Sequence, residues 1–407
     1  MNILVITGSP LRLNSSANLC HRAYICGLIE NGHTIDLLQM SENKLNIDNS
    51  IQMPEFRKVF EYEGSIYSQL GAAKNTKSSD NNIDEISTTS KNSLTNSIFS
   101  YIKHLVRTKI YGTYSFDSIW YLRVKYKFHI KYKYDLVISL AYPYISHKVA
   151  EFLIQKRINT DRWIQIWEDP WSLEPGENYR KSSILKEEHR ILPKADEIIY
   201  VSPITLDYQK HEFIEAADKM RWLPLPAYFS SENTDIDYST LRFGYFGDYS
   251  SNVRNLKPFY NVVYSNNLST TICGSTDEHF LSNDCVSIYP RIPIGELKEY
   301  ENNTNVLVFL CNLYGGQIPG KIYQQSATNK LILFILDGTD EEKKIIYDYY
   351  SQFNRYIFCE NNEESILNAI NDIPKYLNDE RYTKPLDIFS PKNIAKCIID
   401  GTDLKLN

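Results

Sequence analysis

A glycine- and proline-rich bend that ends in a lysine is the segment of this chain best suited to bind an anion. It occurs in CNLYGGQIPGKIYQQSATNKLILFILDG, where Gly315, Gly316, Pro319 and Gly320 precede Lys321. Such a bend exposes backbone N–H groups, and a lysine in the first turn of a helix opposes the helix dipole unless an anion offsets it. The GKS or GKT ending of a Walker A loop is missing. We interpret the bend as a phosphate site, with a purely structural loop as the alternative.

A second stretch, LRFGYFGDYSSNVRNLKPF, carries an arginine that suits the same ligand. Gly244 and Gly247 bracket the end of a short apolar strand, and the polar residues after them let a phosphate approach the backbone. The planar guanidinium of Arg254 can form a bidentate pair with a diphosphate. Taken alone, Arg254 also fits a surface arginine ahead of a helix, so its assignment depends on the Lys321 bend.

The first loop of the chain offers a further binding position. NILVIT is a β-branched apolar run, and Gly8 follows it in the sequence GSPLRLNSS. Glycine lets the backbone come close to a ligand, and the helix that follows offers free N–H groups to an anion or a sugar hydroxyl. A tight turn between strand and helix explains the same residues. The loop is also similar to the flavin-phosphate loop of flavodoxin-like proteins, an alternative that would make the chain a flavin-dependent oxidoreductase.

Two adjacent carboxylates and a histidine are candidates for contact with an acceptor. QIWEDPWS places Glu168 and Asp169 at a strand end between two tryptophans, and His147 begins a helix in AYPYISHKVAEF. Carboxylates beside aromatic rings are typical sugar ligands, although an Asp-Pro turn also uses such residues. A histidine at this position also fits a helix cap or a core residue.

The elements that must position these residues form two successive α/β series. Residues 1–230 alternate apolar strands with helices, and residues 240–385 do so again after the polar linker SSENTDIDYST. Open parallel sheets of this kind hold ligands at the loops that follow their strands. A length of 407 residues also favours two domains over one core. The predicted fold class is therefore α/β, with two doubly wound Rossmann-like domains.

Three segments fall outside this alternation. Residues 71–96 are polar and predict an inserted loop, and residues 386–407 predict a closing helix and tail that pack back on the first domain. Residues 101–134 interleave aromatic residues with eight Lys or Arg against one Asp. Either a solvated face or a surface that rests on anionic lipid explains this segment. Between Arg123 and Lys133 its secondary structure stays open between helix and strand.

Composition excludes several classes of protein. A net charge of −6 and a pI of about 5.8 give no reason to expect a nucleic-acid partner. The seven cysteines are scattered and never spaced as metal ligands, so we expect reduced thiols and no metal. No apolar run approaches the roughly 20 residues that span a bilayer. No signal peptide precedes the first strand, and we expect a cytoplasmic protein.

In combination, these segments resemble GT-B-fold glycosyltransferases of the large family 4, chiefly bacterial enzymes that assemble capsule or lipopolysaccharide glycans. The matching segments run in order over nearly the whole chain: NILVI, ENGHTIDLL, YDLVISLAYPYISHKVA, IWEDPWS, ADEIIYVSP, RFGYFGDYSSNVRN and IPGKIYQQSATNKLILFIL. The last is similar to the family's helix in which a lysine meets the donor pyrophosphate and an acid holds the ribose.

The resemblance implies a role for each candidate residue. Lys321 and Arg254 would bind the diphosphate of a nucleotide-sugar donor. The other donor-binding residues would be Gly8, Gly244, Gly247, Gly316, Pro319, Tyr323 and Gln324. Asp169, Glu168 and His147 would face the acceptor side of a cleft between the two domains. Gln324 stands where the family has its ribose-binding acid, and a neutral amide makes the weaker hydrogen bond.

The resemblance also implies a reaction. A hexose would pass to a hydroxyl of a glycan or lipid-linked glycan with retention of configuration. The reaction would need no metal and no cofactor besides the donor, at or near the inner face of the cell membrane. Two rivals stay open: a non-catalytic scaffold with the same fold, and the flavin-dependent oxidoreductase.

Overall fold

The computed structural model describes residues 1–43, 45, 47–65, 110–173, 180–228, 236–314 and 316–404. The polar segment 71–96, residues 101–109 and Gly315 lie outside these ranges. The chain divides into two compact units. Unit 1 comprises Met1–Val201, Thr205–Leu223 and Pro391–Asn407, and unit 2 comprises Ser202–Ile204 and Pro224–Ser390.

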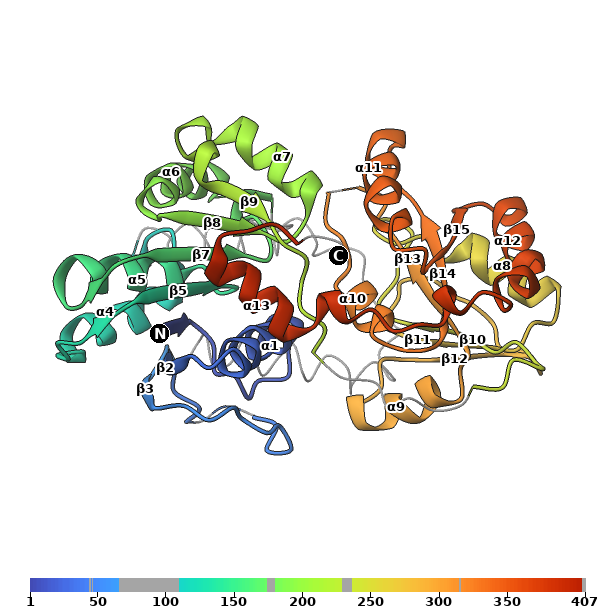
Figure 1. The fold of residues 1–407 in the computed structure, drawn as a ribbon, viewed down its shortest axis with the longest axis horizontal. Helices are drawn as coiled ribbons and strands as arrows, with labels where there is room; N and C mark the ends of the chain where they lie inside the picture. Colours follow the sequence, from blue (N-terminus) through green and yellow to red (C-terminus); the bar gives the residue numbers. More distant parts are fainter. Residues whose placement is uncertain are drawn as a thin grey trace, which may run out of the picture. The chain divides into compact units, whose positions relative to one another are not determined.

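Unit 1 is built on a seven-stranded sheet in which every adjacent pair is parallel (Figure 1). In spatial order the strands are β3 (Lys58–Tyr62), β2 (Thr34–Met40), β1 (Asn2–Thr7), β5 (Leu136–Ala141), β7 (Trp163–Trp167), β8 (Glu197–Tyr200) and β9 (Met220–Trp222). Strands β5 and β7 are buried from end to end, as expected for a parallel sheet whose two faces are covered. A separate parallel pair joins β4 (Lys133–Tyr134) to β6 (Asn159–Thr160).

The described helices of unit 1 connect its strands, except the last, which comes after unit 2 in the sequence. They are α1 (Ser16–Glu30), α4 (Ser118–Lys127), α5 (Ile145–Lys156), α6 (Lys181–Ile191), α7 (Pro203–Glu212) and α13 (Pro391–Asp400). Helix α1 begins at Ser15, whose hydroxyl accepts a hydrogen bond from the Asn18 N–H. In the basic-aromatic segment, α4 ends at Lys127 and β4 begins at Lys133. Between Arg123 and Lys133 the chain is therefore helical up to Lys127, and only Lys133 belongs to a strand.

The last helix of the chain, α13, packs against the first, α1 (Figure 1). The two helices approach so closely at Gly27 that a Cβ there would lie 1.9 Å from the Pro391 carbonyl oxygen. Asn31 Nδ2 of the α1 cap donates to the Lys392 carbonyl at 2.8 Å. The chain from Pro391 onward is therefore part of unit 1.

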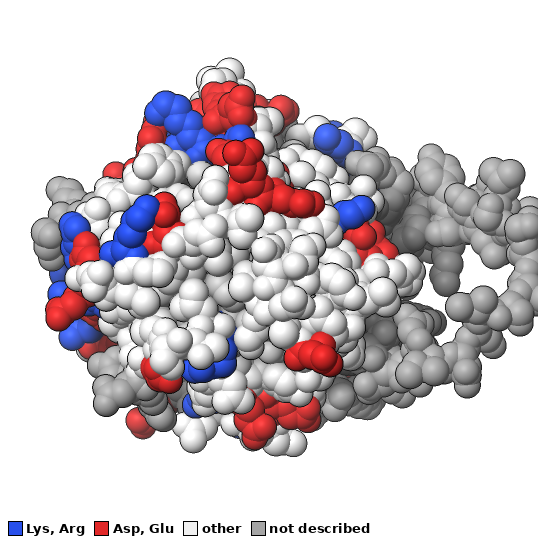
Figure 2. All heavy atoms as spheres, turned by 90° about the vertical axis from the view of Figure 1, so that its right-hand side faces the viewer, with Lys and Arg blue, Asp and Glu red and all other residues white. Residues whose placement is uncertain are grey.

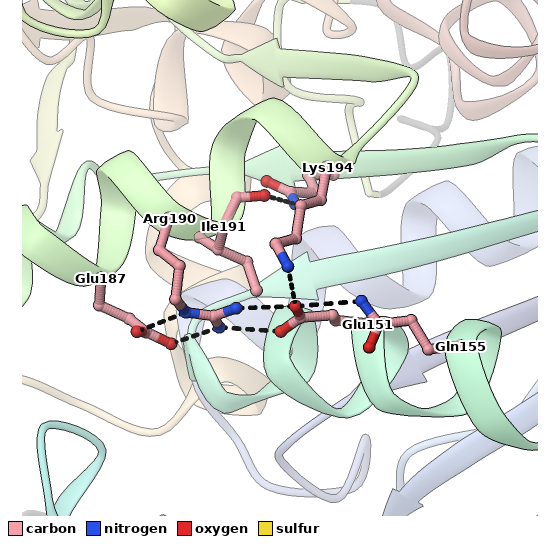
Figure 3. Close-up of polar contacts among 7 residues, drawn as sticks. Glu151, Gln155, Glu187, Arg190, Ile191 and Lys194 are labelled. Atoms are coloured by element: carbon pink, nitrogen blue, oxygen red, sulfur yellow. Dashed lines mark hydrogen bonds and ion pairs between the residues drawn. The ribbon is translucent and has the colours of Figure 1, made fainter.

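An ion-pair network ties α6 to α5 (Figure 3). Arg190 donates to the two oxygens of Glu151 at 2.7 and 2.8 Å and also to Glu187. Lys194 Nζ lies 2.6 Å from Glu151 Oε1. Burial alone would raise the pKa of Glu151, but the hydrogen bonds from Arg190 and Lys194 outweigh it, and the pKa is lowered. Glu151 therefore stays ionised and holds both helices.

Unit 2 is built on a six-stranded sheet that is also parallel throughout. In spatial order its strands are β12 (Val286–Tyr289), β11 (Thr270–Cys273), β10 (Phe243–Phe246), β13 (Val306–Leu310), β14 (Leu331–Leu336) and β15 (Ile357–Glu360). Its helices are α8 (Lys257–Ser265), α9 (Ile294–Asn302), α10 (Lys321–Ser326), α11 (Asp340–Ser351) and α12 (Glu363–Tyr376). A capping box between Thr339 and Glu342 starts α11.

Strand order reverses at one point in each sheet. In unit 1 this point lies between β1 and β5, and in unit 2 it lies between β10 and β13. Doubly wound sheets bind ligands beyond the carboxyl ends of their strands at such switch points. The predicted α/β class with two doubly wound domains is confirmed, and the two switch points are where a site is expected.

Figure 2 shows the distribution of charge on one face of the molecule. Figure 2 looks onto the face of unit 2 that carries α8 and α12. Acidic and basic side chains are scattered over this face, and among the residues that the structure describes they form no continuous basic stripe of the kind that follows a nucleic-acid backbone. None of the described helices combines the length and the hydropathy needed to cross a membrane.

Candidate functional site

The switch point of unit 2 brings Arg254 beside Asn312. After β10 and Gly247 the chain turns back, and the Arg254 N–H donates to the Ser250 carbonyl at 3.0 Å. The guanidinium donates from Nε to Asn312 Oδ1 at 2.7 Å and from Nη1 to the Asp248 carbonyl at 3.1 Å. Asn312 follows β13, so the first bond spans the two strands that flank the switch point. These bonds fix the direction of the cationic fork at the carboxyl edge of the sheet.

Lys321, the first residue of α10, extends over the backbone of Gly247. A Cβ placed on Gly247 would lie 3.6 Å from Lys321 Cε and 3.7 Å from its Cδ. Within the described parts of the chain, no hydrogen bond or ion pair reaches the Lys321 ammonium. Lys321 is therefore a cation at the switch point without a contacting counter-ion.

Neighbouring charges make this lysine receptive to an anion. Burial lowers the pKa of Lys321, and the carboxylates of Glu301 and Asp248 oppose this effect at longer range. The charges of Arg254 and Arg291 lower the pKa further. Three cations thus lie within electrostatic reach of one another, and an anion placed among them would stabilise all three charged forms.

Two residues that the sequence analysis did not single out complete this edge of unit 2. Arg291 Nη2 lies 3.4 Å from Asp248 Oδ2, and Asp248 Oδ1 accepts a hydrogen bond from the Ser275 N–H at 2.9 Å. Gly274 follows β11 and packs so tightly that a Cβ there would lie 1.9 Å from the Gly247 carbonyl oxygen. Gly274 follows the apolar run of β11 directly, and Arg291 follows that of β12 after Pro290. These positions after predicted strands were the signal available in the sequence.

Two predicted donor-binding residues are instead core residues. Gly244 lies inside β10, where a Cβ would approach the Phe246 ring to 2.5 Å and Thr304 Oγ1 to 2.7 Å. Its lack of a side chain is explained by packing and not by a ligand. Tyr323 is fully buried, and its ring lies 5.1 Å from that of Phe389. Neither residue is placed to contact a nucleotide.

The other predicted donor-binding residues of the bend are Gln324, Gly316 and Pro319. The Gln324 Oε1 accepts a hydrogen bond from the Tyr228 N–H at 3.1 Å, so the atom expected to meet a ribose already holds a segment of unit 2. Gly316 has a φ of 67°, which favours glycine, and the Pro319 carbonyl accepts from the Ile322 N–H at 3.3 Å. A ligand role for Gly316 and Pro319 stays a prediction.

At the switch point of unit 1, Gly8 is explained by close packing. A Cβ on Gly8 would lie 2.7 Å from Ile145 Cγ2 and 3.3 Å from Ser146 Oγ. The Gly8 N–H donates to Ser146 Oγ at 2.8 Å. The Gly8 N–H is thus used within the fold, and packing explains the glycine, so a ligand role for Gly8 stays a prediction without support from this contact.

His147 lies in the core and does not face an open site. It is fully buried, its Nδ1 lies 2.7 Å from Ser139 Oγ, and its ring stacks on Trp167 with the centroids 4.3 Å apart. Burial, followed by the charge of His21, lowers the pKa of His147 to about 3. The imidazole is therefore neutral and structural, which corrects the expectation that it contacts an acceptor.

Glu168 lies beside a histidine that the sequence analysis missed, His21 of α1. Glu168 Oε1 lies 3.4 Å from His21 Nε2, and His21 is fully buried. Burial lowers the pKa of His21 to about 3. Burial, followed by the charge of Asp169, raises the pKa of Glu168 well above its ordinary value. Both shifts favour uncharged forms. Asp169 follows β7 and keeps exposed surface, but burial raises the pKa of its carboxyl group as well.

An aromatic pocket of unit 1 includes the loop that carries Asp169. Its lining residues are Tyr114, Asp117, Tyr142, Tyr144, Ile145, Trp171 and Arg180. Tyr144 stacks on Trp171 with the centroids 4.9 Å apart and the planes 16° apart, and Tyr142 is 50% exposed. Aromatic walls with a few polar groups are typical of small-molecule sites. The volume of this pocket, however, is only about 30 Å³, far below the roughly 300–1,000 Å³ of most ligand sites.

No disulfide joins the cysteines of this chain. All seven cysteines are free, and burial raises the pKa of Cys311 to about 12. In the residues that the structure describes, no group of His, Cys, Asp and Glu side chains could hold a metal ion.

Comparison with solved structures finds a similar fold in sugar-transferring proteins. Sucrose-phosphate synthase from Thermosynechococcus elongatus is 13% identical, with a TM-score of 0.51 over 97% of this chain and 94% of that chain. Trehalose-6-phosphate synthase from E. coli, bound with UDP-2-fluoro glucose, is 9% identical, with a TM-score of 0.54 over 98% of each chain. An alpha-glucosyltransferase in complex with UDP and a 13-mer DNA is 9% identical, with a TM-score of 0.51 over 99% of this chain and 96% of that chain.

The likeness lies in the fold and not in the sequence. No protein-family model and no curated protein matches the chain. The structural matches extend over both parallel-sheet units and so account for nearly all of the chain. The flavodoxin-like alternative accounted only for the first loop, whose glycine is explained by packing. The chain therefore has the GT-B fold of these glycosyltransferases.

Proposed function

We propose that this chain is a glycosyltransferase that takes a sugar from a nucleotide-diphosphate donor. The observation that carries the proposal is Lys321, a cation without a contacting partner among the described residues, which extends over Gly247 at the switch point of unit 2. Arg254 and Arg291 lie within its electrostatic reach. Two solved structures with a similar fold contain UDP or a UDP-sugar analogue, the donor class that the proposal assigns.

The cations would act on the leaving group. When the bond between the sugar and the diphosphate breaks, negative charge grows on the diphosphate oxygens. Lys321 and Arg254 would stabilise that charge, and Arg254 is already oriented by its bonds to Asn312 and the Asp248 carbonyl. Charges that are positioned before the reaction stabilise a transition state most effectively, because they need no reorganisation.

The acceptor side is assigned to unit 1. Asp169 is exposed at the end of β7, and Trp171 of the same loop lines the aromatic pocket. We assign the acceptor as a hydroxyl of a glycan or lipid-linked glycan, within surface polysaccharide synthesis in the cytoplasm. This acceptor, the retaining course and the hexosyltransferase class depend on the family resemblance. Asp169 is the acceptor-side residue that the proposal keeps.

A second function, donor binding without transfer, is favoured by one observation. Gln324 replaces the acid of the family, and its side-chain oxygen is bonded to the Tyr228 N–H. A non-catalytic scaffold could bind nucleotide sugars through Lys321 and Arg254 alone. The two functions differ in turnover and not in donor binding.

Calorimetric titration with UDP, GDP and dTDP tests the donor site. We expect one of them to bind, and Lys321→Ala to weaken it by roughly 10- to 100-fold, the range of about 1.5–3 kcal/mol for a hydrogen bond to a charged group. Lys298→Ala, which removes an exposed lysine of α9, is the matched control and should bind as the natural chain does. Equal affinities for Lys321→Ala and Lys298→Ala would exclude this site.

Turnover separates the two functions. The sugar form of the nucleotide that binds is incubated with the protein, with and without glycan acceptors, and released nucleotide is measured. Release that requires Lys321 supports the glycosyltransferase. Binding without any release, across a panel of hexose donors, would assign the scaffold instead.

A further inference from the structure

Helices α4, α5 and α6 of unit 1 line a second cavity, which is much larger than the aromatic pocket. Its volume is about 270 Å³, against about 30 Å³ for the aromatic pocket. It therefore approaches the lower end of the roughly 300–1,000 Å³ that ligand sites span. We name it the α5 pocket, and the side chains that decide its chemistry are Tyr121, Lys148, Glu151, Phe152, Glu187 and Arg190.

Both carboxylates of the α5 pocket are already paired with cations (Figure 3). Arg190 donates hydrogen bonds to both oxygens of Glu151 and to both oxygens of Glu187, at 2.7 or 2.8 Å. Lys194 Nζ lies 2.6 Å from Glu151 Oε1. Two negative and two positive charges therefore balance within this network, and the guanidinium of Arg190 is committed to it.

Lys148 adds a positive charge that this network does not balance. Among the residues that the structure describes, no hydrogen bond or ion pair reaches its ammonium group. Its Nζ lies instead 4.7 Å from the centre of the Tyr114 ring and 5.1 Å from that of the Tyr121 ring. A ring face attracts a cation but accepts hydrogen bonds more weakly than a carboxylate oxygen does. Lys148 is therefore the group in the pocket that is suited to bind an anion.

Burial makes an anion beside Lys148 more favourable. The side chain is half-buried, and burial lowers its pKa, against the opposing negative charge of Glu187. The positive charge of Arg190 lowers the pKa further. An anion in contact with the ammonium group would offset its lost hydration and stabilise the charged form.

Two aromatic side chains form an apolar wall of the same cavity. Tyr121 and Phe152 lie edge to face, with their ring centroids 5.8 Å apart and their planes 84° apart. Both rings line the cavity and keep part of their surface exposed. A flat ring placed against them would bury apolar surface and gain the geometry that aromatic pairs prefer. The α5 pocket thus combines one ammonium group with an aromatic wall.

We propose that the α5 pocket binds an aromatic monocarboxylate, a ligand with one negative charge and one flat apolar ring. The carboxylate would accept hydrogen bonds from Lys148, and the ring would pack against Tyr121 and Phe152. A diphosphate fits less well, because Glu151 and Glu187 line the same cavity and would repel additional negative charge. The proposal concerns residues of unit 1 alone and does not depend on whether the chain transfers a sugar.

Calorimetric titration of the full chain with benzoate tests the proposal. We expect a dissociation constant of about 1 mM or tighter, which is within reach of a ligand of this size. Acetate has the charge without the ring, and benzyl alcohol has the ring without the charge. Each should bind at least about tenfold more weakly than benzoate. Neither UDP nor inorganic phosphate should compete with benzoate.

Each half of the ligand has its own variant. Lys148→Gln should weaken benzoate binding by roughly 10- to 100-fold, because hydrogen bonds between two charged groups are lost. Phe152→Leu keeps an apolar side chain but removes the ring, and should weaken binding by about 3- to 10-fold. Lys156→Gln removes an exposed lysine from the same helix and is the matched control, which should bind benzoate as the natural chain does. Circular dichroism confirms that each variant is folded.

Three outcomes would overturn the proposal. They are an absence of benzoate binding up to roughly 10 mM, equal affinities for benzoate and benzyl alcohol, and equal affinities of Lys148→Gln and Lys156→Gln for benzoate. Inorganic phosphate that displaces benzoate and requires Lys148 would reassign the α5 pocket to a phosphate ligand.

Discussion

Arg254 Nε donates a hydrogen bond to Asn312 Oδ1 at 2.7 Å, and this bond joins the two loops that flank the switch point of unit 2. Asn312 follows β13, and Arg254 lies in the turn after β10. The amide therefore orients a cation without contributing charge of its own. Removal of the amide should leave the charge of the site unchanged and disturb its geometry.

Asn312→Ala tests this relationship. We expect the affinity for the bound nucleotide to fall about tenfold, because Arg254 loses a charge-assisted bond of about 1.5 kcal/mol that fixes its direction. Calorimetric titration measures the change. Asn261→Ala is the control, since Asn261 also bonds a charged side chain, Glu363, but on the exposed side of α8. An unchanged Kd for Asn312→Ala would separate Arg254 from nucleotide binding.

Gly274→Ala should destabilise unit 2. The added Cβ would lie 1.9 Å from the Gly247 carbonyl oxygen, so the two loops must move apart. Overpacking of this kind costs about 1–3 kcal/mol. Urea unfolding followed by circular dichroism measures the loss.

Gly295→Ala is the control, and we expect it to change the free energy of unfolding in the opposite direction to Gly274→Ala. Gly295 lies in α9, and a Cβ there meets nothing within 4 Å. The substitution should stabilise the protein by about 0.5–1 kcal/mol, because alanine favours a helix more than glycine does. If both substitutions stabilise, the loops after β10 and β11 do not pack as described.

The glycines of this chain show which features could be predicted from the sequence and which could not. The parallel strands, the two doubly wound units and the Lys321 bend followed from apolar runs and turn residues. The reason for each glycine did not follow, because sequence spacing does not say what a Cβ would meet. Gly8 and Gly244 looked like ligand residues, and both are explained by packing against neighbouring side chains.

The histidines also show that a local sequence pattern does not reveal which side chains meet in the fold. His147 at a helix start was selected, whereas His21 inside α1 was passed over, and both are fully buried. Which histidine lies beside a carboxylate depends on the register between α1 and β7, which no local pattern encodes. Glu168 and His21 are 147 residues apart in the sequence and 3.4 Å apart in the fold.

Glu188 makes the stability of unit 1 depend on pH. It is buried in α6, and its Oε1 accepts hydrogen bonds from the N–H groups of Trp171 and Ser172 at 3.1 and 3.3 Å. Burial raises its pKa to about 7, against the opposing hydrogen bonds and the charge of His189. A raised carboxyl pKa stabilises the fold fully below pH 4.5 or so, and this contribution is lost as the pH rises through about 7.

Glu188→Gln should remove this dependence. Between pH 4.5 and pH 8 the free energy of unfolding of the natural chain should fall by about 3 kcal/mol more than that of the variant. All five tryptophans lie in unit 1, so urea unfolding followed by tryptophan fluorescence reports on that unit. Glu212→Gln, at an exposed position of α7, is the control. Parallel pH profiles for the natural chain and Glu188→Gln would contradict the prediction.

Ile398→Ala tests whether α13 stabilises unit 1. Ile398 is fully buried, and truncation of such a residue costs about 2–5 kcal/mol. The tryptophan-fluorescence transition should therefore shift to lower urea. Ile373→Ala makes the same truncation at a fully buried position of α12 in unit 2, and should leave that transition in place. Equal shifts of the tryptophan signal would show that α13 does not belong to unit 1 alone.

The packing of α13 on α1 has a consequence for synthesis. A ribosome releases Met1 to Leu223 first and Pro391 onward last, so the helix that covers α1 emerges only after nearly all of unit 2 has been made. Domains usually fold in the order of their translation. Here unit 1 completes its packing only when the segment from Pro391 has been made, after almost the whole chain of unit 2 is already available to fold.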